Sequence, residues 1–188
     1  MTNTTNKLHP GSEFPEISVT MRSGEQQILG KAVNASIAAN ANKPNGWQLV
    51  LVYRGKHCPL CTKYLNALEQ YLAPLAEIDV EVLAVSGDSK AQLEAHMEQL
   101  DISFPIAYGL TVEQMQQLGV YISDPRSPEE TDHPFAEPGL FVVNGEGKLH
   151  VVDISNNPFV RPELGTLVNG LAWIKNPDND YPIRGMHR

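Results

Sequence analysis

The stretch that decides the fold is Trp47-Gln-Leu-Val-Leu-Val-Tyr53, followed directly by Arg54-Gly-Lys-His-Cys58-Pro-Leu-Cys61. Residues 47–53 form a compact apolar run, which is typical of a strand buried on both faces. Proline at position 59 suits the first turn of a helix, because its missing N–H would have no partner there. The sequence therefore predicts a strand that turns into a helix, with Cys58 at the N-cap and Cys61 one turn further on.

The residues before this stretch predict less regular structure. Residues 1–10 predict a disordered tip. Short alternating segments on either side of Ser23-Gly24 predict a hairpin between residues 11 and 31. Residues 32–46 are rich in Ala and Asn and predict a short helix followed by a turn.

The residues after the cysteines predict alternating helices and strands. A helix is expected over residues 59–76, with Leu60 at the start of its inward stripe and Pro74 kinking or ending its last turn. Capping-box patterns at Ser89 and Thr111 predict the starts of two more helices. The other expected elements are strands at 80–86, 104–108, 139–144 and 148–154, a proline-rich loop at 122–138, a helix at 162–174 and a tail on the surface from 176.

This order of elements predicts an α/β fold in one domain. Alternating strands and helices imply a sheet with a parallel portion and helices on both faces, and the closing hairpin makes the sheet mixed. A chain of 188 residues suits a single domain, which we place at residues 11–188. The cysteines follow a core strand, and sites in such folds gather at the carboxyl ends of strands.

The composition excludes several classes of partner. The 14 basic and 22 acidic residues give a net charge of −8, which does not suit a protein that grips a phosphate backbone. We therefore expect no nucleic acid partner. Apolar runs are too short to span a bilayer, and the polar start lacks the apolar core of a secretory signal, so we expect no membrane and a cytoplasmic location.

The two cysteines carry the chemical signal. A sulfur at the N-cap meets the unpaired N–H groups and the positive end of the helix dipole, which favour the reactive thiolate over the thiol. Residues 26–68 contain no Asp or Glu, whereas Arg54, Lys56 and Lys63 lie within five residues of a cysteine. This pattern predicts an electropositive surrounding and a lowered pKa for at least one thiol.

Two other interpretations of the cysteines stay open. The cysteine pair could be half of a zinc site. A complete site needs four ligands, but a second cysteine pair is missing and His57 is badly placed to bind a metal together with both sulfurs, so we expect no metal. Two buried, inert cysteines on a core helix are the other alternative. Elsewhere, Asp132-His133 in the proline-rich loop could serve acid–base chemistry, although an exposed pair of this kind is more often without function.

Residues 53–61, Tyr-Arg-Gly-Lys-His-Cys-Pro-Leu-Cys, resemble the thioredoxin superfamily, and most closely its alkyl hydroperoxide reductase/thiol-specific antioxidant (peroxiredoxin-like) family. Softer resemblances lie at Val85-Ser-Gly-Asp88, at Gly139–Asn144 and at Asn156–Arg161. The resemblance implies a thioredoxin-like fold, in which a mixed central sheet has helices on both faces and an N-terminal hairpin extension.

The resemblance also implies an oxidoreductase in which Cys58 and Cys61 are catalytic, with Arg54, Lys56 and His57 stabilising the thiolate. Such a protein reduces hydroperoxides or protein disulfides and needs no bound cofactor. A thiol reductant, such as a thioredoxin-like protein or glutathione, regenerates the dithiol, and a homodimer is possible. A disulfide reductase without peroxidase activity and a non-catalytic redox sensor or binding protein are the alternatives.

The sequence departs from the peroxiredoxin pattern at the active site. In the peroxiredoxin register Cys61 is the attacking cysteine, and the family's later arginine falls on Pro138, so Arg54 or Arg161 would have to replace it in space. Glu137-Pro138 before a strand instead resembles thioredoxin, in which a cis-proline faces the cysteines and leaves a backbone edge for a substrate chain. We therefore expect Glu137 and Pro138 to bind substrate and Pro138 to be cis.

The roles of the two sulfurs stay open at this point. The N-cap argument favours Cys58 as the nucleophile towards disulfides with Cys61 resolving, because Cys58 is expected to be better exposed. The peroxiredoxin register makes Cys61 the alternative nucleophile towards hydroperoxides.

Overall fold

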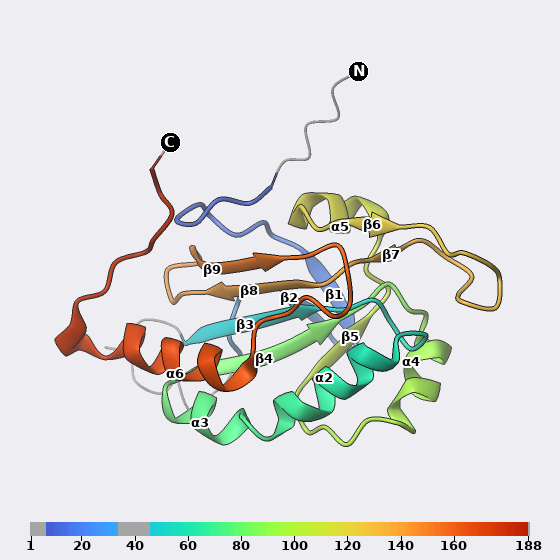
Figure 1. Cartoon of the computed structure of the whole chain (residues 1–188), viewed down its shortest axis with the longest axis horizontal. Helices are drawn as coiled ribbons and strands as arrows, with labels where there is room; N and C mark the ends of the chain where they lie inside the picture. The colour runs from blue at the N-terminus through green and yellow to red at the C-terminus, as the bar shows by residue number, and fades with distance from the viewer. Residues whose placement is uncertain (1–6, 34–45, 188) are drawn as a thin grey trace.

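A seven-stranded mixed sheet forms the centre of the protein (Figure 1). A computed structural model describes residues 7–33 and 46–187. The strand order is β2-β1-β5-β4-β3-β8-β9, with β4 parallel to its neighbours β3 and β5 and the other pairs antiparallel. In that order the strands are Gln26–Ile28, Ser18–Met21, Ile106–Tyr108, Val80–Val85, Trp47–Val52, Gly139–Val143 and Leu149–Ile154. The predicted α/β class, the mixed sheet and the N-terminal hairpin are confirmed.

Helices cover both faces of this sheet, as predicted. Helices α2 (Pro59–Glu69), α3 (Leu72–Glu77) and α6 (Leu164–Lys175) lie on one face, and α5 (Val112–Leu118) lies on the other (Figure 1). Helix α4 (Lys90–Met97) contributes Leu93 to the core beneath α2. The capping boxes expected at Ser89 and Thr111 open α4 and α5, and a left-handed Gly119 ends α5.

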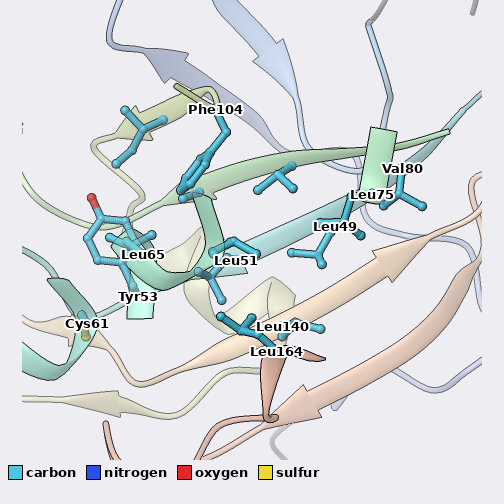
Figure 2. Close-up of a cluster of buried hydrophobic side chains, with 14 of the residues drawn as sticks. Leu49, Leu51, Tyr53, Cys61, Leu65, Leu75, Val80, Phe104, Leu140 and Leu164 are labelled. Atoms are coloured by element: carbon cyan, nitrogen blue, oxygen red, sulfur yellow. The ribbon is translucent and has the colours of Figure 1, made fainter. Parts of the chain in front are cut away.

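The central strand β3 supplies side chains to two separate cores. Leu49 and Leu51, together with Tyr53 directly after the strand, belong to the core under α2, α3 and α6, part of which Figure 2 shows. Val50 and Val52 belong to the opposite core, which includes α5. Because side chains alternate along a strand and both faces are covered, nearly every position of β3 is apolar. This explains the compact apolar run in the sequence.

The helix predicted over residues 59–76 is two helices. α2 ends at Glu69, and α3 begins at Leu72. A proline ring inside a helix clashes with the carbonyl four residues earlier, which for Pro74 is that of Gln70. The chain therefore breaks at residues 70–71 rather than at the proline itself, and Pro74 lies in the first turn of α3.

The first turns of α2 are rotated relative to the predicted stripe, so that Cys61 rather than Leu60 points inward. Its buried residues are Cys61, Leu65 and Leu68, whereas the Leu60 side chain is 45% exposed. The observed spacing of four and three residues is that of a single helix face. This rotation turns Cys61 towards the sheet.

The proline-rich loop at 122–138 contains an element that the sequence did not indicate. Strands β6 (Ile122–Ser123) and β7 (Phe135–Ala136) form a small antiparallel sheet that closes the base of the loop. Phe135 and Ala136 are buried, so this short pairing is fixed by packing more than by strand propensity.

The two ends of the chain are only partly described. The predicted tip falls mainly on residues 1–6, outside the described residues, while residues 7–10 lie against the protein through a hydrogen bond from Lys7 to Tyr121 and packing of Leu8. The helix and turn predicted at residues 32–46 also lie almost wholly outside the described residues. After α6 a 3-10 turn (Pro177–Asn179) leads into a mostly exposed tail.

No helix of the described residues is long and apolar enough to cross a membrane.

A matched pair of leucines on α2 tests this packing. Leu65→Ala removes a fully buried side chain, and we expect it to lower the free energy of unfolding by about 2–5 kcal/mol. Leu60→Ala, five residues earlier on the same helix, should cost under about 0.5 kcal/mol because its side chain is exposed. Urea denaturation of the two variants measures both values, and equal losses would contradict the observed orientation of α2.

Candidate active site

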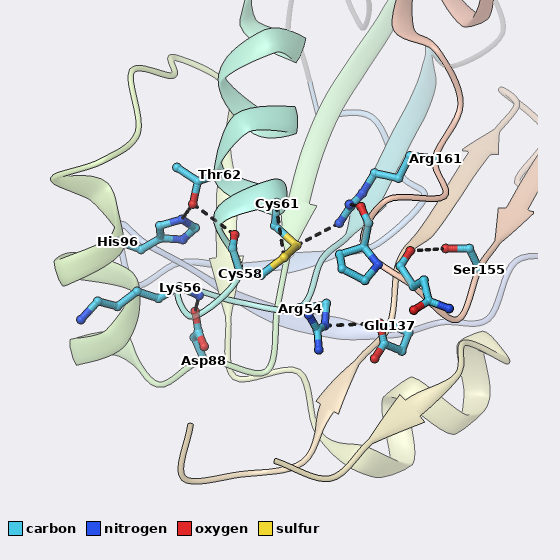
Figure 3. The surroundings of a disulfide bond; sticks show 12 residues. Arg54, Lys56, Cys58, Cys61, Thr62, Asp88, His96, Glu137, Ser155 and Arg161 are labelled. Carbon is cyan, nitrogen blue, oxygen red and sulfur yellow. Dashed lines mark hydrogen bonds and ion pairs between the residues drawn. A yellow bond between two sulfur atoms is a disulfide. The ribbon is translucent and has the colours of Figure 1, made fainter. Parts of the chain in front are cut away.

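The loop that carries the cysteines is held in place by a buried carboxylate. Asp88 lies just after β4 and is 1% exposed, and its Oδ2 accepts the backbone N–H of Lys56 at 2.7 Å (Figure 3). Burial raises the pKa of Asp88 above its usual value, while the Lys56 hydrogen bond acts in the opposite direction. The carboxylate thereby fixes the backbone two residues before Cys58.

Gly55 makes this close approach possible. Its φ of +126° is a backbone conformation that other residues rarely adopt, and a Cβ built there would overlap the Asp88 carboxylate. The Gly55 carbonyl accepts the backbone N–H of Cys58 at 3.1 Å. A tight turn therefore leads from β3 into α2.

The predicted helix start is confirmed. Cys58 is the N-cap of α2, Pro59 occupies the first helical position, and Cys58 Sγ accepts the backbone N–H of Cys61 at 3.2 Å. The two cysteines form a disulfide whose Cα atoms lie 5.2 Å apart. The chain therefore holds a redox pair at the positive end of a helix.

The expected difference in exposure between the cysteines is wrong. Cys58 is 1% exposed and Cys61 is 0% exposed. The Cys58 sulfur bends back over the first turn to meet the Cys61 N–H and the Cys61 sulfur, so it is covered together with Cys61. Exposure does not distinguish the roles of the two sulfurs.

The cation at the disulfide is Arg161. Its Nη2 lies 2.9 Å from Cys61 Sγ, although the two residues are 100 positions apart in the sequence (Figure 3). The guanidinium lies 5.2 Å from the centre of the Tyr64 ring of α2 and donates to the Pro158 carbonyl. Arg161 is thus oriented by its own loop and by the helix that carries the cysteines.

The charge of Arg161 is not neutralised by a contacting carboxylate. No Asp or Glu of the described residues lies within ion-pair distance of it, and its Nε is buried without a hydrogen-bond partner there. Burial lowers the pKa of Arg161, but a guanidinium stays protonated at neutral pH. Its positive charge is therefore available to an anion at Cys61.

Arg54, predicted to stabilise the thiolate, has a different environment. It lies 3.3 Å from Glu137 and 3.7 Å from Glu130, and it stacks 4.7 Å from the centre of the Phe135 ring. Both carboxylates belong to residues after position 68. The fold therefore brings acidic side chains next to residues 26–68, although this stretch itself contains no Asp or Glu. The expectation that the surroundings of the cysteines are free of negative charge is wrong for this reason.

Lys56 and His57 are the other two residues predicted to stabilise the thiolate. The Lys56 side chain is exposed, and its backbone N–H is the group bonded in the loop. Burial, with a smaller contribution from Arg54, lowers the pKa of His57 to about 4. His57 is therefore neutral at pH 7, adds no positive charge beside Cys58, and lies 4.5 Å from the centre of the Phe135 ring.

A second polar contact supports the first turn of α2 from the side opposite Arg161 (Figure 3). Thr62 Oγ1 lies 2.8 Å from Nε2 of the fully buried His96 and 3.3 Å from the Cys58 carbonyl. If Nε2 carries the proton and donates to Thr62, the hydroxyl is free to donate to Cys58, which satisfies both contacts. Burial lowers the pKa of His96 to about 4 and keeps it neutral.

The predicted substrate edge at Glu137-Pro138 is already used inside the protein. Pro138 is trans, since the described residues contain no cis peptide bond, so the cis prediction is wrong. The Glu137 N–H donates to the Tyr121 carbonyl at 2.8 Å, and the Pro138 carbonyl accepts the Ser155 N–H at 3.0 Å. The small β6–β7 sheet and β9 thus hold this segment extended, and the role of both residues in substrate binding stays a prediction.

These groups present a buried cysteine pair at a helix N-terminus with an arginine on one sulfur. No cluster of three or more His, Cys, Asp or Glu within residues 7–33 and 46–187 could hold a metal ion. The sequence profile of the AhpC/TSA family matches residues 10–152. The chain belongs to the AhpC/TSA family. A thiol-dependent, peroxidase-like oxidoreductase function follows from this membership together with the Cys58–Cys61 pair.

Solved peroxiredoxin structures share the fold of this AhpC/TSA protein. A peroxiredoxin-like protein from Aquifex aeolicus is 20% identical, with 88% of this chain and 87% of that chain covered and a TM-score of 0.68. A cysteine-to-serine mutant of the peroxiredoxin 6 of Arenicola marina is 17% identical, with 91% and 75% covered and a TM-score of 0.70. A reduced 2-Cys peroxiredoxin from Plasmodium vivax is 14% identical, with 91% and 84% covered and a TM-score of 0.69. No curated protein matches the sequence significantly.

Some residues of the site had little or no signal in the sequence. The sequence indicates Arg161 only as a replacement for the missing family arginine, within the segment Asn156–Arg161. The clamping role of Asp88 and the Thr62–His96 contact had no local signal, because each depends on two elements brought together by the sheet. The position of Asp88 after a buried strand and its place in the Val85–Asp88 resemblance point to this residue, but neither indicates its contact with Lys56.

Replacing Arg161 tests its effect on Cys61. In reduced protein carrying Cys58→Ser, we expect Arg161→Gln to raise the pKa of the Cys61 thiol by about 1 or more, because an opposite charge in contact with the sulfur is lost. The pH dependence of the alkylation rate measures this pKa. Arg22→Gln, in which the lost cation pairs with Glu94 on the surface, is the matched control and should leave the pKa unchanged.

The neutral histidines of the site predict a pH dependence of stability. Folded His96 and His57 take up protons only near pH 4, whereas the unfolded chain does so near 6.5. The unfolded state therefore binds more protons between these values, and the free energy of unfolding should fall as the pH falls from about 6.5 to about 4. Urea denaturation across this range should show a shallower fall for His96→Gln, which keeps a donor for Thr62, than for the wild type. Exposed His187→Gln should leave the slope unchanged.

Proposed function

We propose that this protein reduces hydroperoxides, with Cys61 as the attacking cysteine, Cys58 as the resolving cysteine and Arg161 as the residue that activates the attack. The observation that carries the proposal is the 2.9 Å contact between Arg161 Nη2 and Cys61 Sγ. A cation in contact with one sulfur favours the thiolate of that residue, and the thiolate is the nucleophile. In the peroxiredoxin register the family's arginine falls on Pro138 of this chain. Arg161 would supply that missing positive charge.

The attack transfers one oxygen atom to sulfur. The Cys61 thiolate attacks the terminal oxygen of ROOH, the O–O bond breaks, and RO⁻ leaves and takes a proton from the solvent. Negative charge develops on the leaving oxygen. The Nε–H of Arg161, which is buried without a hydrogen-bond partner among the described residues, is a donor suited to that charge. Cys61 is then a sulfenic acid.

Cys58 resolves this intermediate without a large rearrangement. Its sulfur attacks the Cys61 sulfenic acid, forming the Cys58–Cys61 disulfide and releasing water. The disulfide present in the structure is the product of this step. Two electrons from an external thiol reductant then return the dithiol, so the cycle needs no bound cofactor. Cytoplasmic location and assembly as a homodimer stay predictions.

A disulfide reductase without peroxidase activity is the second candidate. It is favoured by the position of Cys58 at the N-cap, where its sulfur accepts the Cys61 N–H, an arrangement that also stabilises a thiolate on Cys58. In that case Cys58 would attack an external disulfide and Cys61 would resolve the mixed disulfide. The two candidates thus assign the nucleophile to different sulfurs.

Single-cysteine variants distinguish the two candidates. Reduced Cys58→Ser should react with one equivalent of hydroperoxide and accumulate a sulfenic acid on Cys61, detected by mass spectrometry with a dimedone-type probe. Cys61→Ser should form no such adduct, and its reaction with hydroperoxide should fall to the background rate. In the Cys58→Ser protein, Arg161→Gln should lower the second-order rate constant by about 100-fold, which is the cost of losing one charge-stabilising donor.

The opposite labelling pattern would support the reductase instead. If Cys61→Ser accumulates a mixed disulfide through Cys58 with a small disulfide reagent, and neither variant forms a sulfenic acid, hydroperoxide is not the substrate. If both variants react no faster than free cysteine with both reagents, the protein is a non-catalytic sensor or binding protein.

A further inference from the structure

Thr62 links the N-cap cysteine of α2 to the neighbouring helix α4 (Figure 3). Its side-chain oxygen lies 3.3 Å from the Cys58 carbonyl oxygen and 2.8 Å from His96 Nε2. The Cys58 carbonyl also accepts the backbone N–H groups of Cys61 at 3.0 Å and of Thr62 at 3.1 Å. The backbone of Cys58 is therefore held at one atom by the first turn of α2 and, through Thr62, by α4.

The two contacts of Thr62 assign the proton on His96. A carbonyl oxygen only accepts, so the Thr62 hydroxyl donates to Cys58 and its oxygen accepts from Nε2 of His96. Burial lowers the pKa of His96 to about 4, so the ring carries a single proton at pH 7. With that proton on Nε2, donation runs in one direction, from His96 through Thr62 to the N-cap cysteine.

His96 is fixed by packing inside the protein. Its side chain is fully buried, as is that of Leu93 on the same helix. Its ring centre lies 5.9 Å from that of Tyr53, which is buried directly after β3. Because close-packed side chains have little freedom to move, His96 offers Thr62 a donor at a fixed position. The position of Cys58 is thus tied to α4 and to the end of the central strand.

This contact matters most when the disulfide is open. In the oxidised protein the Cys58–Cys61 bond itself holds the two sulfurs together. In the dithiol that link is lost, and the hydrogen bonds to the Cys58 backbone are left to keep its sulfur beside Cys61. A group that is already oriented loses less conformational entropy when its bond forms, so the bond forms faster and to a greater extent.

We propose that Thr62 and His96 are positioning residues that hold Cys58 ready to close the disulfide with Cys61. They rest on the redox pair of the proposed function and act on its resolving step. In that step Cys58 Sγ attacks the sulfur of the Cys61 sulfenic acid and the S–O bond breaks. The hydroxyl takes up the proton of the Cys58 thiol and leaves as water.

Positioning of Cys58 also protects the attacking cysteine. A second hydroperoxide competes with Cys58 for the Cys61 sulfenic acid, to which it transfers an oxygen atom, giving a sulfinic acid and an alcohol. The sulfinic acid cannot be resolved by a thiol, so each such event removes one protein molecule from the cycle. The faster Cys58 closes the disulfide, the more hydroperoxide the protein withstands.

A contact that only stabilised the fold would behave differently. It would act equally on the disulfide and on the dithiol, and an equilibrium shifts only through interactions that differ between its two states. Loss of a positioning contact instead frees the dithiol alone, because the disulfide still constrains the oxidised form. The equilibrium between the two forms therefore separates the two roles.

The equilibrium is measured in buffers of reduced and oxidised glutathione, with acid quenching, alkylation and mass spectrometry of the intact protein. Thr62→Val keeps the shape of the side chain but has no hydroxyl. We expect it to lower the equilibrium constant for forming the Cys58–Cys61 disulfide by about three- to tenfold, as for one lost hydrogen bond. A tenfold fall is about 30 mV in reduction potential. Thr62→Ser keeps the hydroxyl and should restore the wild-type value.

The histidine gives a second, independent pair of variants. His96→Leu removes the donor and should lower the equilibrium constant by a similar factor, whereas His96→Gln keeps an N–H donor and should restore it. The double variant Thr62→Val with His96→Leu should be no worse than either single variant, because both changes break the same chain of hydrogen bonds.

Leu68→Ala is the matched control for stability. Leu68 is fully buried on the same helix and makes no part of the polar contact. This variant should unfold at a lower urea concentration and still show the wild-type redox equilibrium. All variants are compared under conditions in which circular dichroism shows them folded.

A kinetic measurement applies the same variants to the hydroperoxide cycle. During turnover with hydroperoxide and dithiothreitol, Thr62→Val should accumulate sulfinic acid on Cys61 at a hydroperoxide concentration about three- to tenfold lower than the wild type, in proportion to its slower closure. Leu68→Ala should match the wild type.

Two results of the equilibrium measurement would overturn the proposal. One is an unchanged equilibrium constant in Thr62→Val and His96→Leu. The other is an equal fall in Leu68→Ala, which would show that the stability of α2 alone is responsible. Since no hydroperoxide is present in this measurement, it decides the positioning role even if the protein proves not to be a peroxidase.

Discussion

The hydrogen bond from the Lys56 backbone to the buried Asp88 carboxylate is the contact on which the site depends. It joins the loop after β3 to the end of the neighbouring parallel strand β4. Cys58 reaches the N-cap only because this loop turns sharply at Gly55, where a side chain of any other residue type would meet the carboxylate. The sheet therefore positions the redox pair through one side chain, and the helix dipole and the arginine act on sulfurs placed in this way.

The two arginines near the cysteines illustrate how little a charge count reveals about a site. Arg54 is close to Cys58 in sequence, but Glu130 and Glu137 neutralise it, so it anchors the proline-rich loop to the end of β3. Arg161 is distant in sequence, lacks a contacting carboxylate among the described residues and lies against a sulfur. What decides the electrostatic effect of each cation is the set of counter-ions that the fold brings to it.

The sequence predicts the parts of this structure that depend on local patterns. The apolar run at β3, the proline after Cys58 and the capping boxes at Ser89 and Thr111 each concern a few consecutive residues, and each is confirmed. The errors concern the packing of distant segments. The exposure of Cys58, the orientation of Leu60, the trans peptide at Pro138 and the carboxylates around Arg54 are all set by neighbours that no local pattern identifies.

The separation of 100 residues between Cys61 and Arg161 has a consequence for the order in which this protein matures. A chain is synthesised from its N-terminus, so β3, α2 and both cysteines leave the ribosome well before the segment that carries the cation. Until β8 and β9 have paired and α6 has docked, the cysteines can be oxidised or exchanged only with the reactivity of a helix N-terminus. If Cys61 is the attacking cysteine, as we propose, its full reactivity arises together with completion of the C-terminal third of the fold, which limits the exposure of an activated thiolate in the nascent chain.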